Sequence, residues 1–472
     1  MIKKIIKSLL PKGALSWYHR GLAFLGALYY GFPSRRLIVI GVTGTKGKTS
    51  TVHLIAKILE YAQYNVGVIS GLEMRVGKDS VPNKMKMTMP GRFFIQQYLR
   101  KMVDAGCTYA VVEVTSEGIA QHRHRHIDFD AAVFTNIAPE HLEAHGSFEK
   151  YLAEKEKLFA SLRTGVKTKI VKGRKVHIAK TIIVNGDDAH ADDFLSYPAD
   201  RRYACHVGSE EDEDAESMPA EHVSAVLRDV TGSKSVFLVR DVPFTMHLPG
   251  LFNIANALLA IAVSIGEGIP LGVIAKALET VKGIPGRMED VSGVADFRVI
   301  VDYAHTPHSL DAVYRTIYSN RSSPQMPAGR LICVLGAAGG GRDRWKRPVL
   351  GAVAGMWCDE VIVTDEDPYD EDPRVIMGAV AEGVQHAQTQ YSRFFGEGVT
   401  LPRSEGRRAP IPKIIPDRRG AIHAALRSAE KGDVVAITGK GSEQIMAVQG
   451  GKLIPWDDRQ IVREELAKVN GA

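Results

Sequence analysis

Cysteine is scarce in this chain of 472 residues, and its four cysteines are scattered. Cys107, Cys205, Cys333 and Cys358 include no Cys-X-X-Cys pair, which argues against a zinc ribbon. The same scatter argues against a disulfide framework and is typical of proteins from a reducing cytoplasm. We therefore expect a cytoplasmic protein that folds around apolar cores rather than around cross-links.

A clean apolar run long enough to cross a bilayer is also lacking. The most apolar stretch, residues 14–31, is interrupted by His19 and Arg20, and spanning requires about 20 residues. The segment FPSRR at 32–36 follows instead of a small-residue cleavage site, against a secretory signal. We expect residues 1–36 to form a helical segment packed on the body of the protein. Contact with a membrane surface is the alternative.

Neither sign of charge dominates the composition. Lys and Arg number 60 against 54 Asp and Glu, a net charge of +6. This mild excess suits anionic small molecules such as nucleotides and is too weak to indicate nucleic-acid binding. With 45% hydrophobic and 24% charged residues, the chain reads as a soluble globular protein of two or three domains.

A glycine-rich segment near the start of the chain carries the strongest chemical signal. An apolar run leads into residues 41–51, GVTGTKGKTST. Gly44 and Gly47 let the backbone curl so that its N–H groups face an anion. Lys48 would then neutralise phosphate oxygens, and the hydroxyl of Thr49 would bind Mg²⁺. The segment predicts ATP binding, with a plain glycine turn as the weaker alternative.

Strand-like and helix-like segments alternate along most of the chain, which predicts doubly wound α/β domains. We expect a central P-loop domain over 37–285, a Rossmann-like C-terminal domain over 286–472, and a basic solvated hairpin or loop between Arg163 and Lys180. Helical patterns lie at 51–64, 148–159 and 253–266. Strand-like runs lie at 37–40, 66–69, 110–114, 131–134, 181–184, 298–301, 331–335, 360–363 and 433–437.

Polar residues follow two of these strands, where α/β sites form. Glu113 ends one strand and could complete a Mg²⁺ shell begun by Thr49. A buried structural carboxylate would fit that position equally well. His141 follows the next strand and could bind a second metal, although a lone histidine is more often a surface or hydrogen-bonded residue.

Taken together, the motifs resemble the Mur ligase family in order and spacing, over roughly residues 37–465. The segment at 41–51 is close to that of Mur ligases and folylpolyglutamate synthetases, although Val42 stands where the strict P-loop has its first glycine. Within the family, the later motifs resemble the MurE type, which adds an amino acid to a UDP-N-acetylmuramoyl-dipeptide. The matching segments are EVTSEGIAQHR (113–123), FTNIAPEHLEAHG (134–146), YLAEK (151–155), LPGLFNIAN (248–256), PGRME (285–289), DYAHTP (302–307), GRDRWKRP (341–348) and GKGSE (439–443).

The resemblance implies roles for individual residues. Lys155 falls where Mur ligases have a lysine that CO₂ converts into a carbamate, and the implied catalytic residues are Lys48, Lys155 and His141. The implied Mg²⁺ ligands are Thr49, Glu113, His141 and Lys155. The implied ATP contacts are Gly44, Thr45, Lys46, Gly47, Lys48, Thr49, Ser50, Asn253, Asn256, Asp302 and His305. The implied contacts of the peptidyl acceptor and incoming amino acid are Thr88, Thr115, Gln121, Arg123, Arg342, Asp367, Gly439 and Glu443.

Three departures from the family pattern stand out. One apolar helix dominates the residues before the phosphate loop, so we expect the uridine-nucleotide domain of MurE-like enzymes to be absent or much reduced. Residues 364–373 read TDEDPYDEDP, where enzymes that add meso-diaminopimelate have Asp-Asn-Pro-Arg. Tyr369 replaces that arginine and Asp367 the asparagine, which removes a carboxylate clamp and favours a basic or neutral amino acid. Met89 replaces the second threonine of a Thr-Thr-Pro motif.

The resemblance implies a monomeric ATP-dependent ligase of peptidoglycan precursor synthesis. An acceptor carboxylate would be phosphorylated on Mg²⁺–ATP and then attacked by the amine of an amino acid. A related ligase that extends a glutamate or other amino-acid polymer is the alternative. A non-catalytic ATP-binding protein is the third reading, disfavoured because Lys48, Glu113, His141 and Lys155 are all present.

Overall fold

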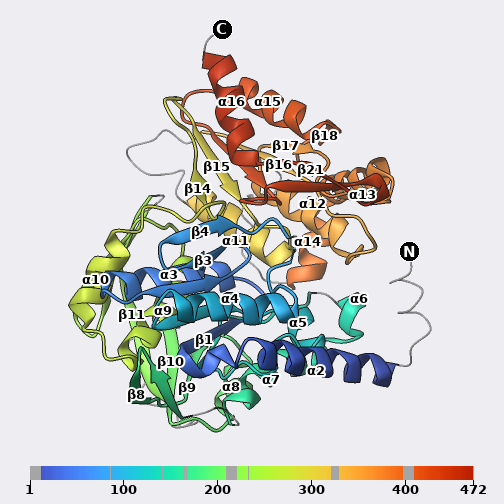
Figure 1. Ribbon diagram of the computed structural model, residues 1–472. Helices are drawn as coiled ribbons and strands as arrows, with labels where there is room; N and C mark the ends of the chain where they lie inside the picture. Colours follow the sequence, from blue (N-terminus) through green and yellow to red (C-terminus); the bar gives the residue numbers. More distant parts are fainter. Residues whose placement is uncertain are drawn as a thin grey trace.

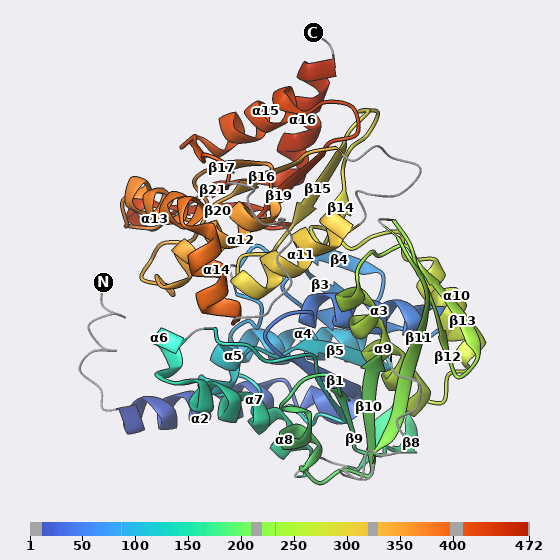
Figure 2. The same ribbon diagram turned by 180° about the vertical axis from the view of Figure 1, so that it is seen from behind.

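The computed structural model describes residues 12–85, 87–140, 142–163, 165, 167–208, 220–231, 233–319, 329–396 and 409–470. Within these residues, the helices and strands form two α/β bodies, each around its own sheet (Figures 1 and 2). His141, which we predicted to bind metal and to act in catalysis, lies outside the described residues.

The first body is built on an eleven-stranded sheet of order β13-β12-β11-β10-β9-β6-β1-β5-β2-β3-β4. Its centre, from β11 to β2, is parallel, and antiparallel hairpins extend both edges. The strands are β1 (Ile38–Thr43), β2 (Val66–Ile69), β3 (Glu73–Val76), β4 (Asp79–Pro82), β5 (Tyr109–Glu113), β6 (Ala131–Phe134), β9 (Thr181–Asn185), β10 (Arg201–Val207), β11 (Glu221–Val230), β12 (Ser235–Val239) and β13 (Val242–Met246). Since β1 lies between β5 and β6, the loops after these three strands open at one edge.

Helices cover both faces of this sheet, because its central strands are buried on both sides. One face packs against α3 (Lys48–Tyr61), α9 (Leu251–Gly266) and α10 (Leu271–Glu279). The other face packs against α4 (Arg92–Asp104), α7 (Phe148–Leu162) and α8 (Ala191–Leu195). The smaller elements are α2 (Lys12–Tyr29), η1 (Pro33–Arg36), α5 (Ser116–Ala120), α6 (Leu142–His145), and the hairpin β7 (Thr168–Val171) and β8 (Arg174–His177).

The second body has a six-stranded sheet of order β14-β15-β19-β16-β17-β18, parallel except for β14. Its strands are β14 (Glu289–Asp290), β15 (Arg298–Asp302), β16 (Leu331–Leu335), β17 (Glu360–Val363), β18 (Lys413–Ile414) and β19 (Val434–Thr438), beside the hairpin β20 (Ile445–Val448), η2 (Gln449–Gly451) and β21 (Lys452–Pro455). The helices on one face are α11 (Pro307–Ser319), α12 (Lys346–Trp357), α13 (Pro373–Gln385) and α14 (Ala387–Phe395), and those on the other are α15 (Arg418–Ser428) and α16 (Asp458–Asn470).

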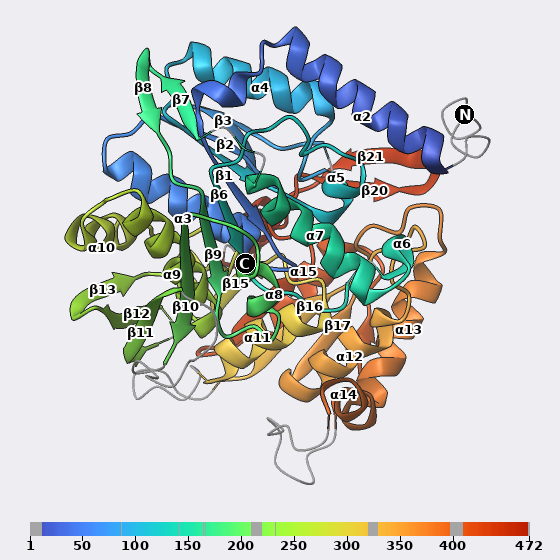
Figure 3. The same ribbon diagram turned by 90° about the horizontal axis from the view of Figure 1, so that it is seen from below.

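The doubly wound α/β fold predicted from the sequence is confirmed, and strands β2, β6, β16 and β17 have the predicted bounds. The predicted N-terminal helix is α2, which packs beside α4 (Figure 3). No described helix is long and apolar enough to cross a membrane.

The basic segment at 163–180 forms a hairpin as expected, but its expected solvation is wrong for two lysines. Lys169 and Lys180 are buried and both bind the carboxylate of Asp130, at 2.5 and 2.8 Å. The backbone N–H of Val39 donates to the same carboxylate at 2.8 Å. The hairpin is therefore fixed to the start of β1, because one buried carboxylate pairs with both lysines and with the Val39 N–H.

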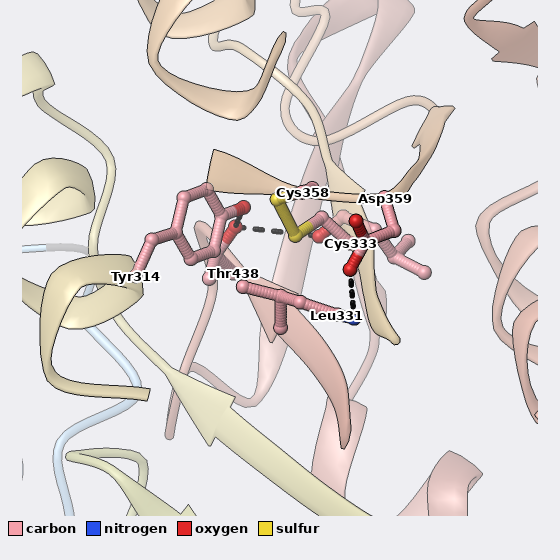
Figure 4. Close-up of a disulfide and its surroundings, with 7 residues drawn as sticks. Tyr314, Leu331, Cys333, Cys358, Asp359 and Thr438 are labelled. Atoms are coloured by element: carbon pink, nitrogen blue, oxygen red, sulfur yellow. Dashed lines mark hydrogen bonds between the residues drawn. A yellow bond between two sulfur atoms is a disulfide. The ribbon is translucent and has the colours of Figure 1, made fainter. Parts of the chain in front are cut away.

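The expectation that the cysteines stay separate is also wrong for one pair. Cys333 of β16 and Cys358, directly after α12, form a disulfide, with their Cα atoms 6.1 Å apart (Figure 4). The pairing is a tertiary effect. Strands β16 and β17 are neighbours, and Leu331 and Asp359 exchange hydrogen bonds between them at 2.8 Å. Cys107 and Cys205 are free and buried.

Candidate active site

The phosphate loop connects β1 to α3 and requires glycine at two positions. Gly44 and Gly47 have φ of 146° and 82°. A Cβ on Gly44 would lie 1.9 Å from Oγ1 of Thr135, and one on Gly47 would lie 2.2 Å from Oδ1 of Asn256. Only glycine fits both the dihedral angles and the space, so the loop can direct its backbone N–H groups and the α3 N-terminus at an anion.

Two lysines converge on this loop. Lys48 folds back, and its Nζ donates to the carbonyls of Gly44 at 3.0 Å and Thr45 at 2.8 Å. Nζ of Lys155, from α7, donates to the same Gly44 carbonyl at 2.6 Å and lies 4.5 Å from the ring centre of Tyr151. Burial, and then the charge of Lys48, lower the pKa of Lys155 well below its ordinary value. Among the described residues, neither lysine forms an ion pair, and the Lys48 ammonium is available to phosphate oxygens.

Thr49 and Glu113 meet at the edge where β1 and β5 end. The Thr49 hydroxyl donates to Oε2 of Glu113 at 3.0 Å, and the backbone N–H of Gly71 donates to the same oxygen at 2.9 Å. This hydroxyl–carboxylate pair fits Mg²⁺, which prefers oxygen ligands and usually retains several waters and phosphate oxygens. The described residues contain no group of three or more His, Cys, Asp or Glu arranged to hold a metal alone. The ion's remaining ligands would therefore have to come from other oxygens, such as those of a nucleotide.

The opposite wall joins the two bodies of the molecule. Nζ of Lys46 lies 3.0 Å from Oε1 of Glu140 and 3.2 Å from Nε2 of His305, which comes from the second body. Burial lowers the pKa of His305 to about 4 and that of Lys46 to about 8. The ring is therefore neutral near pH 7. Its Nδ1–H donates to the Tyr303 carbonyl at 2.8 Å, and its Nε2 accepts from Lys46.

Most of the other residues predicted to contact the nucleotide form hydrogen bonds within the protein. Nδ2 of Asn253 donates to the Pro249 carbonyl at 2.8 Å, and Oδ1 of Asn256 accepts from Thr51 at 3.3 Å. The Thr45 hydroxyl lies 3.0 Å from the Tyr151 hydroxyl, and Ser50 is buried at the start of α3. Asp302, which we predicted to approach ATP, accepts from the N–H groups of Met288 and Ala304, both at 2.7 Å. Burial raises its pKa.

A second polar cluster connects to the phosphate loop through Arg287. This guanidinium lies 3.4 Å from the Thr49 hydroxyl and 4.4 Å from the ring centre of Tyr303. The Tyr303 hydroxyl donates to Glu443 at 3.3 Å, and Glu443 also accepts from Lys440 at 3.0 Å. The predicted ATP and amino-acid residues are thus joined by consecutive side-chain contacts.

At the amino-acid end of this cluster, Asp367 is hydrogen-bonded, whereas one carboxylate oxygen of Glu366 is not. Asp367 accepts from Nζ of Lys440 at 3.2 Å and from the N–H of Ala447 at 2.7 Å. Oε2 of Glu366 is buried and has no hydrogen-bond partner among the described residues, and burial raises the Glu366 pKa. Gly439 has φ of 112°, and a Cβ there would lie 2.4 Å from that oxygen. Glycine therefore keeps open the space beside Glu366.

One predicted acceptor residue, Thr88, lies near the Thr49–Glu113 pair. A Cβ on Gly71 would lie 3.3 Å from Oγ1 of Thr88 and 3.6 Å from Oε2 of Glu113. Thr115 caps α5 by accepting from the Gly118 N–H at 3.1 Å. Nη2 of Arg123 donates to Oε1 of Gln121 at 2.8 Å, and Nη1 donates to the Met89 carbonyl.

Four site residues did not figure among those predicted: Glu140, Arg287, Tyr303 and Lys440. Each lies inside one of the motifs quoted above, so a charged or aromatic residue within a motif was the available signal. Arg342, which we predict to contact the amino acid, has its guanidinium 5.0 Å from the ring centre of Tyr369.

Comparison with known proteins identifies two family domains in this chain. Residues 42–264 match the Mur ligase middle domain, and residues 286–441 match the Mur ligase glutamate ligase domain. The UDP-N-acetylmuramyl-tripeptide synthetase of Roseiflexus sp. (strain RS-1) is 36% identical over 461 residues, which cover 95% of this chain and 82% of the relative.

Two further proteins extend the similarity. The UDP-N-acetylmuramoyl-L-alanyl-D-glutamate--2,6-diaminopimelate ligase of Alkaliphilus metalliredigens (strain QYMF) is 35% identical over 450 residues, covering 95% of this chain and 81% of that protein. A solved structure of a ligase with that name has a TM-score of 0.55 at 27% identity, over 92% of this chain and 79% of the other. This chain belongs to the Mur ligase family of ATP-dependent ligases that form peptide bonds.

Proposed function

We propose that this protein joins an amino acid to the peptide carboxylate of a muramyl-peptide acceptor, as MurE-type ligases do. The observation that carries the proposal is the continuous contact path from Thr49 through Arg287 and Tyr303 to Glu443. The path supports the proposal because it connects residues proposed for phosphate binding with residues proposed for amino-acid binding. The similarity to tripeptide synthetases over nearly the whole chain supports the same reaction class.

The reaction follows from where the charges lie. An oxygen of the acceptor carboxylate attacks the γ-phosphorus of ATP, and the bond from that phosphorus to ADP breaks. The amine of the amino acid then attacks the acyl carbon, the bond to phosphate breaks, and the nitrogen loses a proton. Lys48, beside the loop, would stabilise charge on the transferring phosphoryl group. Mg²⁺ held at Thr49 and Glu113 would supply further positive charge there.

We propose that Lys155 is carbamylated in the active enzyme. Only a neutral amine attacks CO₂, and the lowered pKa of Lys155 raises the neutral fraction near pH 7. In the step, the Nζ lone pair forms a bond to the carbon of CO₂ and one proton leaves nitrogen. The product is a carboxylate-like group beside the phosphate loop. It would replace a buried ammonium, which is costly there, with a ligand for a metal ion.

The acceptor class has a second candidate. Residues 12–36 form α2 and η1, which pack on the first body, rather than an α/β unit that could bind a nucleotide. A ligase that extends a glutamate or other amino-acid polymer, whose acceptor carries no uridine part, is this second candidate. The acceptor's peptide carboxylate would in both cases lie near Thr88, Thr115 and Arg123.

One assay separates these candidates. Phosphate release is measured with the full chain, ATP and Mg²⁺ over a panel that pairs UDP-muramyl dipeptide, free muramyl dipeptide and poly-γ-glutamate with single amino acids. We expect release with a muramyl peptide and an amino acid together. Release only with polyglutamate would select the alternative, and no release with any pair would contradict the ligase proposal.

The setting of the reaction is also a proposal. We infer a monomer that works in the cytoplasm, where ATP and nucleotide-linked precursors are present. We also infer that residues 37–285 and 286–472 act as separate domains that close on the substrates. Closure would exclude water from the acyl phosphate, which water would otherwise hydrolyse.

A further inference from the structure

The α2 helix turns its large apolar side chains to solvent and its small ones to the protein. Ala23, Gly26 and Ala27 are buried beside α4, where a Cβ on Gly26 would lie 3.4 Å from Cα of Phe93. The opposite face carries exposed large side chains, with exposed fractions from 45% to 77%: Trp17, Tyr18, Phe24, Leu25, Leu28 and Tyr29. An ordinary surface helix has the reverse pattern, so a contiguous apolar stripe of this kind marks an interaction surface.

Positive charge borders this apolar stripe. The Arg20 guanidinium lies 5.8 Å from the ring centre of Trp17, and that of Arg35 lies 4.5 Å from the ring centre of Phe32. The Phe32 ring is in turn 6.2 Å from that of Phe24. Asp128 is an acidic side chain that reaches this border, where it pairs with Arg35 at 3.3 Å.

The sequence around α2 contains basic residues and no acidic ones. Residues 1–36 contain seven Lys and Arg, and no Asp or Glu occurs before Glu60. A partner for this surface must therefore be both apolar and negatively charged. A second copy of the chain does not fit, since a two-fold interface would bring the two basic borders together.

A lipid surface matches both properties. Trp, Tyr, Phe and Leu on one face, with Arg and Lys beside them, are typical of helices that lie in the interface of an anionic bilayer. Trp and Tyr favour the headgroup level because their rings are amphipathic. No described helix can span a membrane, so α2 would lie on the surface rather than cross it.

The position of α2 allows such docking. It runs along the edge of the first body that is turned away from the second body, beside α4 (Figures 1 and 3). A bilayer against this edge would leave the junction of the two bodies, with its phosphate loop, accessible to substrates.

We propose that α2 docks this protein on the surface of an anionic lipid bilayer. Trp17, Leu25 and Leu28 insert among the headgroups, while Arg20 and Arg36, which is exposed at the end of η1, contact lipid phosphates. Apolar insertion and charge attraction act together, because either signal alone gives weak, reversible binding. This surface is independent of the ligase proposal, and either can fail without the other.

The test is flotation of the full chain with phosphatidylcholine vesicles, with and without phosphatidylglycerol, at low and high salt. We expect binding only with phosphatidylglycerol, and loss of that binding at high salt. L25S/L28S should weaken it by about tenfold or more, since two exposed leucines are removed from the inserted face. R20Q/R36Q should weaken it by about tenfold through lost attraction to anionic lipid.

Two measurements guard against a folding artefact. Val294→Ser, at a 92% exposed valine in the second body, is the matched control and should bind like the wild type. Trp17 fluorescence should shift to the blue with anionic vesicles, and W17F should abolish the shift while vesicle binding persists in reduced form.

Three results would overturn the proposal. These are absence of binding to anionic vesicles, equal binding to both vesicle types, and binding unchanged in L25S/L28S. If the protein does not bind vesicles but forms a concentration-dependent dimer that L25S/L28S abolishes, the face would be assigned to a second copy of the chain instead.

Discussion

Two lysines share one carbonyl oxygen at the phosphate loop, and their environments separate their roles. Lys48 begins α3 at the mouth of the loop, whereas Lys155 is buried beneath it on α7. Burial drives an ammonium group towards its neutral form, and it lowers the pKa of Lys155. We therefore expect Lys48 to act as a cation and Lys155 to act through its carbamate.

Lys48→Ala should abolish the reaction, because it removes the ammonium group that lies against the Gly44 and Thr45 carbonyls of the loop. Loss of the charge should reduce kcat by about 10³-fold or more. Phosphate release with the best substrate pair measures the effect. Lys57→Ala, at a half-buried lysine further along the same helix, is the control and should stay active. Near wild-type turnover in Lys48→Ala would contradict the assignment of the loop.

Lys155→Ala should be nearly inactive and partly restored by short carboxylic acids that occupy the vacated space. Lys155→Arg keeps the charge but cannot form a carbamate, so it should stay inactive with or without the added acid. Turnover against acetate concentration measures the rescue. An active Lys155→Arg enzyme would show that the charge suffices and that no carbamate is needed.

The choice of amino acid rests on the segment around Tyr369. Asp367 is already paired with Lys440, so Glu366 offers the one carboxylate oxygen there with no described partner. An ammonium such as that of lysine would stabilise it, whereas the distal carboxylate of diaminopimelate would be repelled. We expect lysine or a neutral amino acid to be incorporated over meso-diaminopimelate when both compete in one assay.

A double variant sharpens this prediction. D367N/Y369R introduces the Asn-Pro-Arg sequence of diaminopimelate-adding enzymes and should move incorporation towards diaminopimelate. Asp370→Asn should leave the preference unchanged. A dominant diaminopimelate product from the wild type would mean that Arg342, which lies over the Tyr369 ring, supplies the carboxylate clamp.

At the scale of elements, a buried ion pair can attach a hairpin to the body of the protein when the hairpin has little apolar surface of its own. The β7–β8 hairpin is mostly exposed, and it is fixed to the first body through Lys169 and the Asp130 carboxylate. Lys169 also donates to the carbonyls of Leu37 and Asp128, at 3.0 and 2.6 Å. Its ammonium therefore satisfies three buried oxygens at the entry to β1.

Lys169→Met should lower the free energy of unfolding by about 2 to 4 kcal/mol, because it removes the donor to the Leu37 and Asp128 carbonyls and one of the partners of Asp130. Lys180 still pairs with Asp130, so the loss should stay below that of an isolated buried charge. Urea unfolding followed by circular dichroism measures the difference. Lys175→Met, exposed on β8, is the matched control, and an equal effect of the two variants would contradict the role assigned to Asp130.

At the scale of the whole molecule, a neutral histidine links the two bodies. His305 projects from the loop after β15 to Lys46 on the phosphate loop. Its folded-state pKa of about 4 lies below the ordinary value of 6.5. The unfolded chain therefore takes up this proton first as the pH falls, and stability present above pH 6.5 is lost as the pH approaches 4.

His305→Gln should flatten that dependence. Between pH 6.5 and 4, the variant should lose about 2 to 3 kcal/mol less unfolding free energy than the wild type. Chemical denaturation at several pH values gives the two slopes. His386→Gln, at an exposed histidine on the second body, should follow the wild type. Parallel slopes for His305→Gln and wild type would show that His305 is not held neutral in the folded protein.

The sequence by itself determined the fold class and the phosphate loop, because both depend on local patterns. Apolar runs of four to six residues end in glycine or polar residues, and this periodicity predicted several strands to the residue. Gly44 and Gly47 were recognisable because no other residue tolerates their backbone angles. The motif order then indicated the family and most of the residues around the loop.

Only the tertiary structure decided which distant side chains meet. Arg287 links Thr49 to Tyr303, Lys169 and Lys180 share Asp130, and Cys333 bonds to Cys358, all across separations that no local pattern encodes. The outward face of α2 is a further case. Its composition predicted a helix, but α4 decides which face is covered, because only the small residues allow the two helices to approach closely.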